Sequence, residues 1–247
     1  MRTGKKIIAV AAATALTVTG SMASFAAAPD PKYNQAVTDN TEGKTVADKE
    51  GVTSELTGTI SITDISVKVP VKAIFDIDPN KELKAGEASP QITGQATNYT
   101  ITNLSSVPLN ISVTNVATAK GSDTAGAAPT FVTTLNALES TEHGIMFSIR
   151  PSDTTAAPVP VLPADKTTAL SDEWLKPSAA AGGTIGDTYK FQDSGSTYKL
   201  EETGTAGGKD TLTMTLYGAT KKGWTSGDTF TVTPTFTVSL YKAPSNP

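Results

Sequence analysis

Hydrophobic and polar residues alternate along most of the chain between residues 65 and 240. At 65–77 the apolar side chains occupy odd positions, and at 230–240 they occupy most even positions, with threonine at most of the positions between them. A period of two is typical of a β-strand with one buried face. Shorter runs of the same alternation predict strands at residues 99–101, 107–113, 131–135, 145–149, 189–191, 198–200 and 212–216.

Turn residues divide these strands and predict how they connect. The Asn-Leu-Ser-Ser sequence at 103–106 and the Asp-Ser-Gly-Ser sequence at 193–196 each predict a hairpin between the strands that flank them. Pro70 lacks the backbone N–H that a strand ladder requires. Residues 65–77 therefore form either two strands or one edge strand.

A short alternating segment precedes Asp64 in the opposite phase. Its core-facing positions are Leu56, Gly58, Ile60 and Ile62. A one-residue change of phase turns every side chain to the other face, so the segment need not continue the strand that follows. It is either the first strand of its own domain, which sequential pairing favours, or an assembly strand that completes a neighbouring subunit.

The strand pattern is interrupted only once at length. Residues 151–187 contain five prolines, and within them residues 171–175 predict one helical turn capped by Ser171. No helix of ordinary length is predicted between residue 56 and the C-terminus. Many short strands separated by turns predict an all-β fold, a single antiparallel β-sandwich of Ig-like or jelly-roll-like type over residues 56–247, with residues 151–187 as a long loop.

The N-terminal residues have the features of a secretory leader. A basic start is followed by an apolar run at 7–18 and by small residues, and Ser24 and Ala26 suit the −3 and −1 positions of a cleavage site. We expect cleavage after Ala26, which makes residues 1–26 a signal peptide. The polar residues 27–55, which contain few apolar side chains, are expected to form a flexible arm. The predicted location is therefore extracellular, at the cell surface or in the cell wall.

Charge and composition narrow the classes of partner. The net charge is −4, and removal of the leader deletes three basic and no acidic residues, leaving −7. This balance argues against nucleic acid and anionic membrane as partners, since phosphate binding requires clustered cations. The absence of cysteine excludes disulfides and thiolate chemistry, and a single histidine excludes a multi-histidine metal site within one chain.

One spacing matches a calcium loop. Asp76, Asp78, Asn80 and Glu87 occupy positions 1, 3, 5 and 12 of an oxygen-ligand loop. Lys81 stands where such a loop requires glycine, and Pro79 stiffens the turn. A turn that ends a strand is therefore the favoured interpretation, with calcium as the alternative. No other cofactor is expected.

Candidate chemistry is otherwise sparse. His143 lacks a neighbouring nucleophile signature, and the carboxylate pairs Asp172 with Glu173 and Glu139 with Glu142 are more typical of solvated loops than of a glycosidase. We therefore predict that the protein is not an enzyme. The two indoles, Trp174 and Trp224, could instead serve as platforms on which sugars stack.

Two segments resemble known exported proteins. Residues 65–80 together with 99–113 resemble the opening strands of Gram-positive cell-surface β-sandwich proteins, and residues 229–244 are similar to the closing strand of WxL-type domains. The order of leader, polar arm and sandwich also resembles the camelysin and TasA group of matrix-fibre subunits. The resemblance implies a surface, matrix or fibre role and transfers no individual residue.

Together these observations predict a secreted or cell-surface structural protein, in the form of a matrix or fibre subunit that contacts itself or other surface proteins. A carbohydrate-binding, adhesin-like module that recognises cell-wall glycan is the alternative, and a glycoside hydrolase comes third. No membrane partner is expected once the leader is removed.

Overall fold

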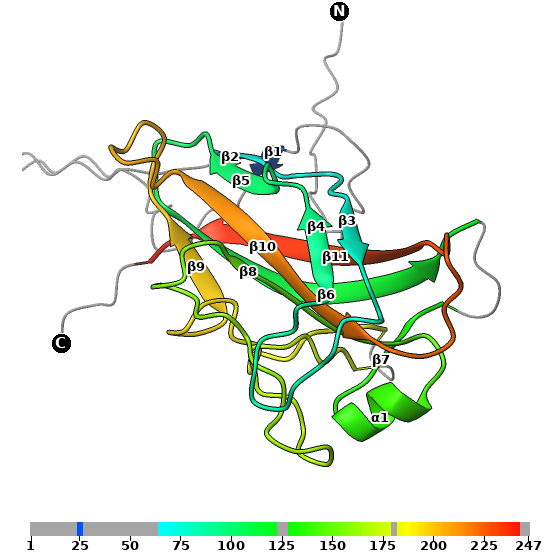
Figure 1. Ribbon diagram of the computed structural model, residues 1–247. Coiled ribbons are helices and arrows are strands. Elements are labelled where there is room, and N and C mark those ends of the chain that lie inside the picture. The colour runs from blue at the N-terminus through cyan, green and yellow to red at the C-terminus, as the bar shows by residue number, and fades with distance from the viewer. Residues whose placement is uncertain (1–23, 27–63, 123–127, 179–181, 243–247) are drawn as a thin grey trace, which may run out of the picture.

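The computed structural model describes residues 24–26, 64–122, 128–178 and 182–242. These residues form a β-rich fold of curled sheets with almost no helix (Figure 1). The one helix among them, α1, spans Leu135–Ser140. No helix in the described part of the chain is long and apolar enough to cross a membrane.

The largest sheet has six strands in the order β1-β2-β5-β10-β8-β7. Its pairs are antiparallel except for β7 with β8, which is parallel. Its strands are β1 (Ser24–Ala26), β2 (Asp64–Lys68), β5 (Thr100–Asn103), β10 (Thr211–Thr220), β8 (Gly144–Pro151) and β7 (Thr130–Phe131).

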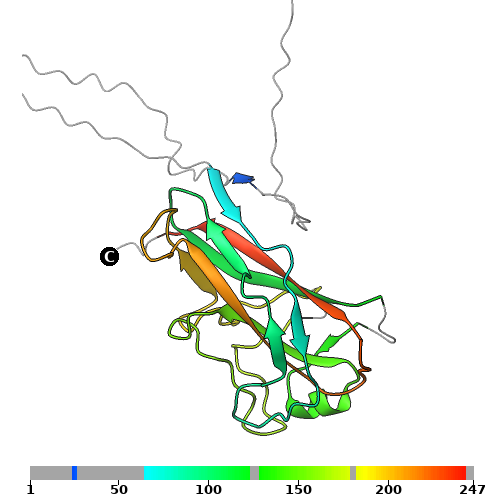
Figure 2. The ribbon, with the colours of Figure 1, turned by 45° about the horizontal axis from the view of Figure 1, so that its top comes forward.

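Two smaller sheets complete the described fold. A three-stranded antiparallel sheet has the order β11-β6-β9, and a two-stranded sheet pairs β3 with β4 beside β10 (Figures 1 and 2). Their strands are β11 (Phe230–Leu240), β6 (Leu109–Lys120), β9 (Thr197–Leu200), β3 (Phe75–Ile77) and β4 (Ile92–Gln95). The β11–β6 register shifts between Thr235 and Phe236, at a bulge.

The main core draws side chains from both larger sheets. Ile101 and Phe147 of the six-stranded sheet pack in one buried cluster with Leu109, Ile111 and Leu200 of the three-stranded sheet. Removing each such side chain from water stabilises the fold by about 1.5–3 kcal/mol. The alternation in the sequence thus marks the side chains that meet between the sheets.

Strand β8 is buried on both faces, which its alternation does not predict. Phe147 and Ile149 face the main core, while Met146 joins a second cluster with Leu138 and Trp174 on the other face. This second cluster comes mainly from α1 and from the segment between β8 and β9. The predicted long loop therefore covers the sheet and supplies part of the core.

Several predicted strands are confirmed at their positions. Residues 65–77 form two strands, β2 and β3, with Pro70 between them. In β11 the threonines are exposed, while the apolar side chains are half-buried against the core. The strands predicted at 145–149, 198–200 and 212–216 correspond to β8, β9 and β10.

The predicted hairpin around residues 103–106 is wrong. The strands on either side, β5 and β6, belong to different sheets. The buried Asn103 holds the connection, because its side-chain Nδ2 donates 2.8 Å hydrogen bonds to the carbonyls of Val107 and Glu201. A side-chain amide that ties two sheets together leaves no periodic signal in the sequence.

Three local predictions also fail. Residues 189–191 form no strand, although a single bridge joins Gln192 to Gly195. The strand predicted at 131–135 ends early, since Thr134 caps α1 by accepting a hydrogen bond from the Ala137 N–H. Residues 171–175 form a turn rather than a helix.

Side-chain amides form hydrogen bonds with backbone groups of β10 that no neighbouring strand of the described fold bonds. Beyond its pairing with β5, strand β10 is met by the Gln95 amide, which accepts from the Leu216 N–H and donates to the Leu216 carbonyl. The Gln91 Oε1 accepts from the Thr220 N–H at 2.7 Å. These amides satisfy backbone groups that a further strand would otherwise bond.

Candidate functional site

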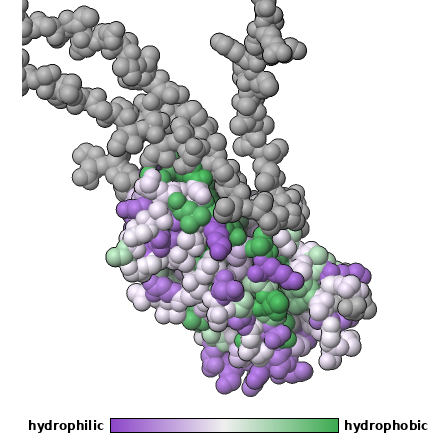
Figure 3. All heavy atoms as spheres, turned by 90° about the horizontal axis from the view of Figure 1, so that it is seen from above, coloured by the Kyte–Doolittle hydropathy of each residue, from purple (hydrophilic) through white to green (hydrophobic). Residues whose placement is uncertain are grey.

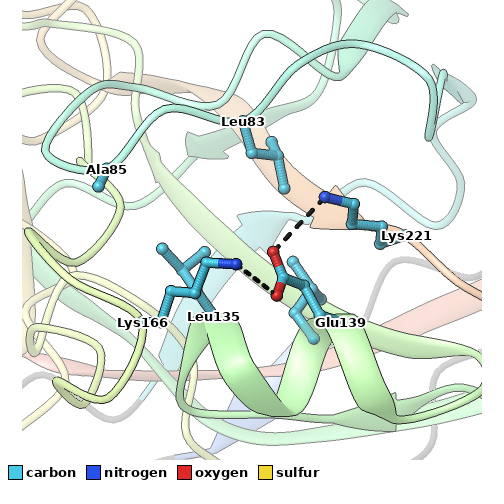
Figure 4. Close-up of a pocket in the computed structure, with 7 residues that line it drawn as sticks. Leu83, Ala85, Leu135, Glu139, Lys166 and Lys221 are labelled. Carbon is cyan, nitrogen blue, oxygen red and sulfur yellow. Dashed lines mark hydrogen bonds and ion pairs between the residues drawn. The ribbon is translucent and has the colours of Figure 1, made fainter.

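The described residues enclose a small hollow beside α1 (Figure 4). The helix contributes Leu135, Leu138 and Glu139, and loops contribute the other lining residues, Leu83, Ala85, Lys166 and Lys221. The hollow has a volume of about 100 Å³ and is lined by leucines and by charged side chains. It forms because α1 turns its apolar face to the second core and leaves Glu139 at the margin.

Ion pairs organise the rim of this hollow. The Lys166 Nζ lies 2.8 Å from Glu139 Oε2, and the Lys221 Nζ lies 3.6 Å from Glu139 Oε1. The hydrogen bond from Lys166 is the main reason that the pKa of Glu139 lies below its ordinary value. With two ammonium groups and one carboxylate, the rim carries a net positive charge. The hollow could therefore accept an apolar side chain that has an acidic residue next to it.

The residues of the calcium alternative lie in β3 and the loop that follows it. Asp78 Oδ1 accepts a 2.9 Å hydrogen bond from the Asn80 N–H, which closes a turn at the end of β3. Asp76 is exposed on the strand itself, and Glu87 lies in a later turn where its N–H donates to the Lys84 carbonyl. Within the described ranges, no group of three or more acidic or histidine side chains could hold a metal ion.

The two tryptophans have different surroundings. Trp174 is fully buried, and its Nε1 donates a 2.9 Å hydrogen bond to the Val161 carbonyl. It has no exposed face on which a sugar could stack. Trp224 is half-buried, packs against Phe230 with ring centroids 5.0 Å apart, and donates from Nε1 to Thr220 Oγ1.

His143 is a buried turn residue just before β8. Its φ of 54° lies in the left-handed region, and its ring packs edge-on against Trp224 at 4.7 Å. Its Nε2 has no hydrogen-bond partner among the described residues. The ring packs as an aromatic group, with its orphan nitrogen buried.

In each acidic pair considered in the sequence analysis, the two residues make different contacts. Glu139 joins the lysines of the hollow, whereas Glu142 is exposed. Asp172 forms a 2.6 Å ion pair with Lys176, while the Glu173 backbone carbonyl accepts from Ser148.

Sequence reasoning missed the hollow because its members come from distant parts of the chain. Glu139 was noted only as a solvated carboxylate, and neither of its lysine partners carried a motif. The residues proposed as an assembly strand, 56–62, lie outside the described residues. Comparisons with protein-family models, curated proteins and solved structures give no match.

Proposed function

We propose that this chain is a secreted or cell-surface structural protein, a matrix or fibre subunit built on a β-sandwich of Ig-like or jelly-roll-like type. The proposal rests on the difference between two of the sheet edges, the outer sides of β11 and β2. One edge is blocked against pairing, whereas the other is paired only with residues that the predicted signal peptidase would remove. A structural subunit that adds strands at one chosen edge would have this arrangement.

The blocked edge is the outer side of β11. Pro234 is paired with Val116, whose N–H donates away from β11 to the Gly183 carbonyl. In an antiparallel ladder, two residues opposite each other both direct their backbone groups outward when they do not bond each other. Pro234 therefore places its missing donor on the outer edge.

The acceptor edge is the outer side of β2. It is paired with β1, where Phe25 stands opposite Ile65 and Ala26 opposite Asp64. Cleavage after Ala26 would detach β1 and free the backbone groups of β2 on this side. Ile65 and Val67 are buried, so an incoming strand would extend a sheet that already has a core beneath it.

The proposed donor is residues 54–63 of a second copy. Pairing with β2 of the same chain through a two-residue hairpin would place Ile62 and Thr63 in the turn. Such turns require positive φ, which β-branched residues strongly disfavour. A strand from another copy has no such restriction. Head-to-tail addition of this kind extends into a filament.

The test uses the mature chain with residues 27–63 deleted. We expect a folded monomer that binds an added peptide of residues 52–64, and electron microscopy of the culture supernatant and cell surface should show antibody-labelled fibres. If the deleted chain unfolds while the intact chain stays monomeric at high concentration, the segment belongs to its own domain. Glycan binding lost in Trp224→Ala would instead support the adhesin-like alternative.

A further inference from the structure

Two apolar side chains project from the segment that leads into β3. Ile74 is 68% exposed and Val71 is 63% exposed, the highest values among the exposed large hydrophobic residues of the described chain. Ile74 immediately precedes β3, in which Phe75 and Ile77 are half-buried while Asp76 between them is exposed. The face seen from above in Figure 3 carries small, separate apolar patches among polar ones.

Charged residues flank Ile74 along the chain. Lys72 and Asp76, two residues before and after it, are also exposed. Only Asp76 of the three lies within β3, which begins at Phe75. The segment thus presents an exposed cation, an exposed apolar side chain and an exposed anion in order.

The hollow beside α1 has matching size and charge. An apolar cavity of about 150 Å³ holds benzene, so the hollow's 100 Å³ suits about four carbons, the size of an isoleucine side chain. Its apolar lining consists of Leu83, Ala85, Leu135 and Leu138. Its rim offers the cations Lys166 and Lys221 to an acidic neighbour, and Glu139 to a basic one.

We propose that Ile74 of one copy inserts into the hollow beside α1 of the next copy, with Asp76 approaching the two rim lysines. This inference rests on the proposed self-assembling function and adds a second contact to it. Ile74 is exposed on its own chain, so it does not occupy that chain's hollow. The start of β3 lies away from α1 in Figures 1 and 2, so the two halves of the contact are on different parts of the molecule.

A contact between two different patches cannot close on itself in a symmetric dimer. It leaves one free projection and one free hollow at the ends of every oligomer, so that further copies can add. An aliphatic anchor seated in a pocket, with polar groups at the margin, is one arrangement around which binding interfaces are built.

The test uses two variants of the full mature chain, each lacking one half of the contact. Ile74→Asp removes the projection, and Ala85→Trp fills the hollow from an exposed position. Each alone should raise the apparent dissociation constant of assembly roughly tenfold or more in sedimentation velocity. An equal mixture should assemble more tightly than either variant alone, because the Ile74 projection of Ala85→Trp still fits the hollow of Ile74→Asp.

Val159→Asp is the matched control, since Val159 is also an exposed apolar residue but lies on another loop. It should assemble as the parent does, and all three variants should keep the parent melting temperature. Assembly of Ile74→Asp at the parent concentration, or a mixture that assembles no more tightly than either variant alone, would overturn this contact. In either case binding of the 52–64 peptide would be unaffected, whereas failure of the parent to assemble at all would overturn the proposed function as well.

Discussion

Arg150 is the most unusual buried residue of the described fold. It lies on β8 with no exposed surface, and its Nη1 donates a 2.9 Å hydrogen bond to the Lys190 carbonyl. Its Nε and Nη2 have no hydrogen-bond partner among the described residues, and no carboxylate there forms an ion pair with it. A buried charge with open donors is costly, so this side chain weakens the fold.

Replacing Arg150 with methionine should therefore stabilise the protein. Methionine fills a similar volume without a charge, and we expect the free energy of unfolding to rise by about 1 kcal/mol. Arg150→Ala is the control, because it removes the charge but leaves a cavity that costs about 3 kcal/mol. Urea unfolding of both variants measures the difference. A loss of stability in Arg150→Met would mean that the guanidinium has favourable contacts.

Tyr189 predicts how stability depends on alkaline pH. Its hydroxyl accepts from the Ile149 N–H at 3.2 Å and donates to the Ile149 carbonyl, and burial raises its pKa to about 12. The unfolded tyrosine ionises near pH 10. The unfolded chain therefore binds fewer protons than the folded chain above this pH, and stability falls.

We expect the contribution of Tyr189 to be complete below about pH 10 and lost progressively toward about pH 12. Tyr189→Phe should be less stable at neutral pH, because two hydrogen bonds are lost, but should show a shallower alkaline decline. Denaturant unfolding between these pH values tests this. Equal alkaline slopes in parent and variant would contradict it.

At the scale of elements, side-chain amides form hydrogen bonds with backbone groups that a neighbouring strand would usually bond. The fully buried Gln91 accepts from the Thr220 N–H through Oε1 and donates through Nε2 to the carbonyls of Pro79 and Lys81. It thus joins β10 to the loop after β3. Both ends of the amide are required, since one oxygen accepts and one nitrogen donates.

Gln91→Glu should destabilise the fold by about 2–3 kcal/mol at neutral pH, because a carboxylate would face two carbonyls with no proton to donate. Lowering the pH should recover part of the loss, as the buried carboxyl gains a proton more readily in the folded state. Gln95→Glu, at a half-buried position, is the control and should lose less. Urea unfolding at two pH values decides, and a loss independent of pH would contradict this account.

The elements that the sequence predicts best are those that alternate over many residues. Strands β10 and β11 were predicted because burial of one face leaves a period of two, and the break at Pro70 was one of two alternatives left by its missing N–H. Partner choice leaves no such period, so the separation of β5 from β6 by Asn103 was missed. The candidate hollow was missed for the same reason, since it exists only where α1 meets two loops and the end of β10.

At the scale of the whole molecule, calcium provides a simple test. We expect added calcium to leave the melting temperature unchanged, because Asp78 already accepts from the Asn80 N–H and no metal-binding group of acidic side chains occurs in the described ranges. A ligand that bound only the folded state would raise the melting temperature. A shift of several degrees at millimolar calcium, lost in Asp76→Asn, would establish the site after all.

Edge protection at β11 predicts the behaviour of the molecule in solution. Pro234→Thr would restore a backbone donor at the outer edge of the 11-residue strand β11, where Val232 and Phe236 are the neighbouring residues of the same parity. An uninterrupted, uncharged edge invites pairing between copies, so this variant should self-associate at lower concentration than the parent. Thr233→Val, which changes a side chain but adds no donor, is the control. Light scattering over a concentration series measures the effect, and equal association of Pro234→Thr and the parent would show that Pro234 does not protect this edge.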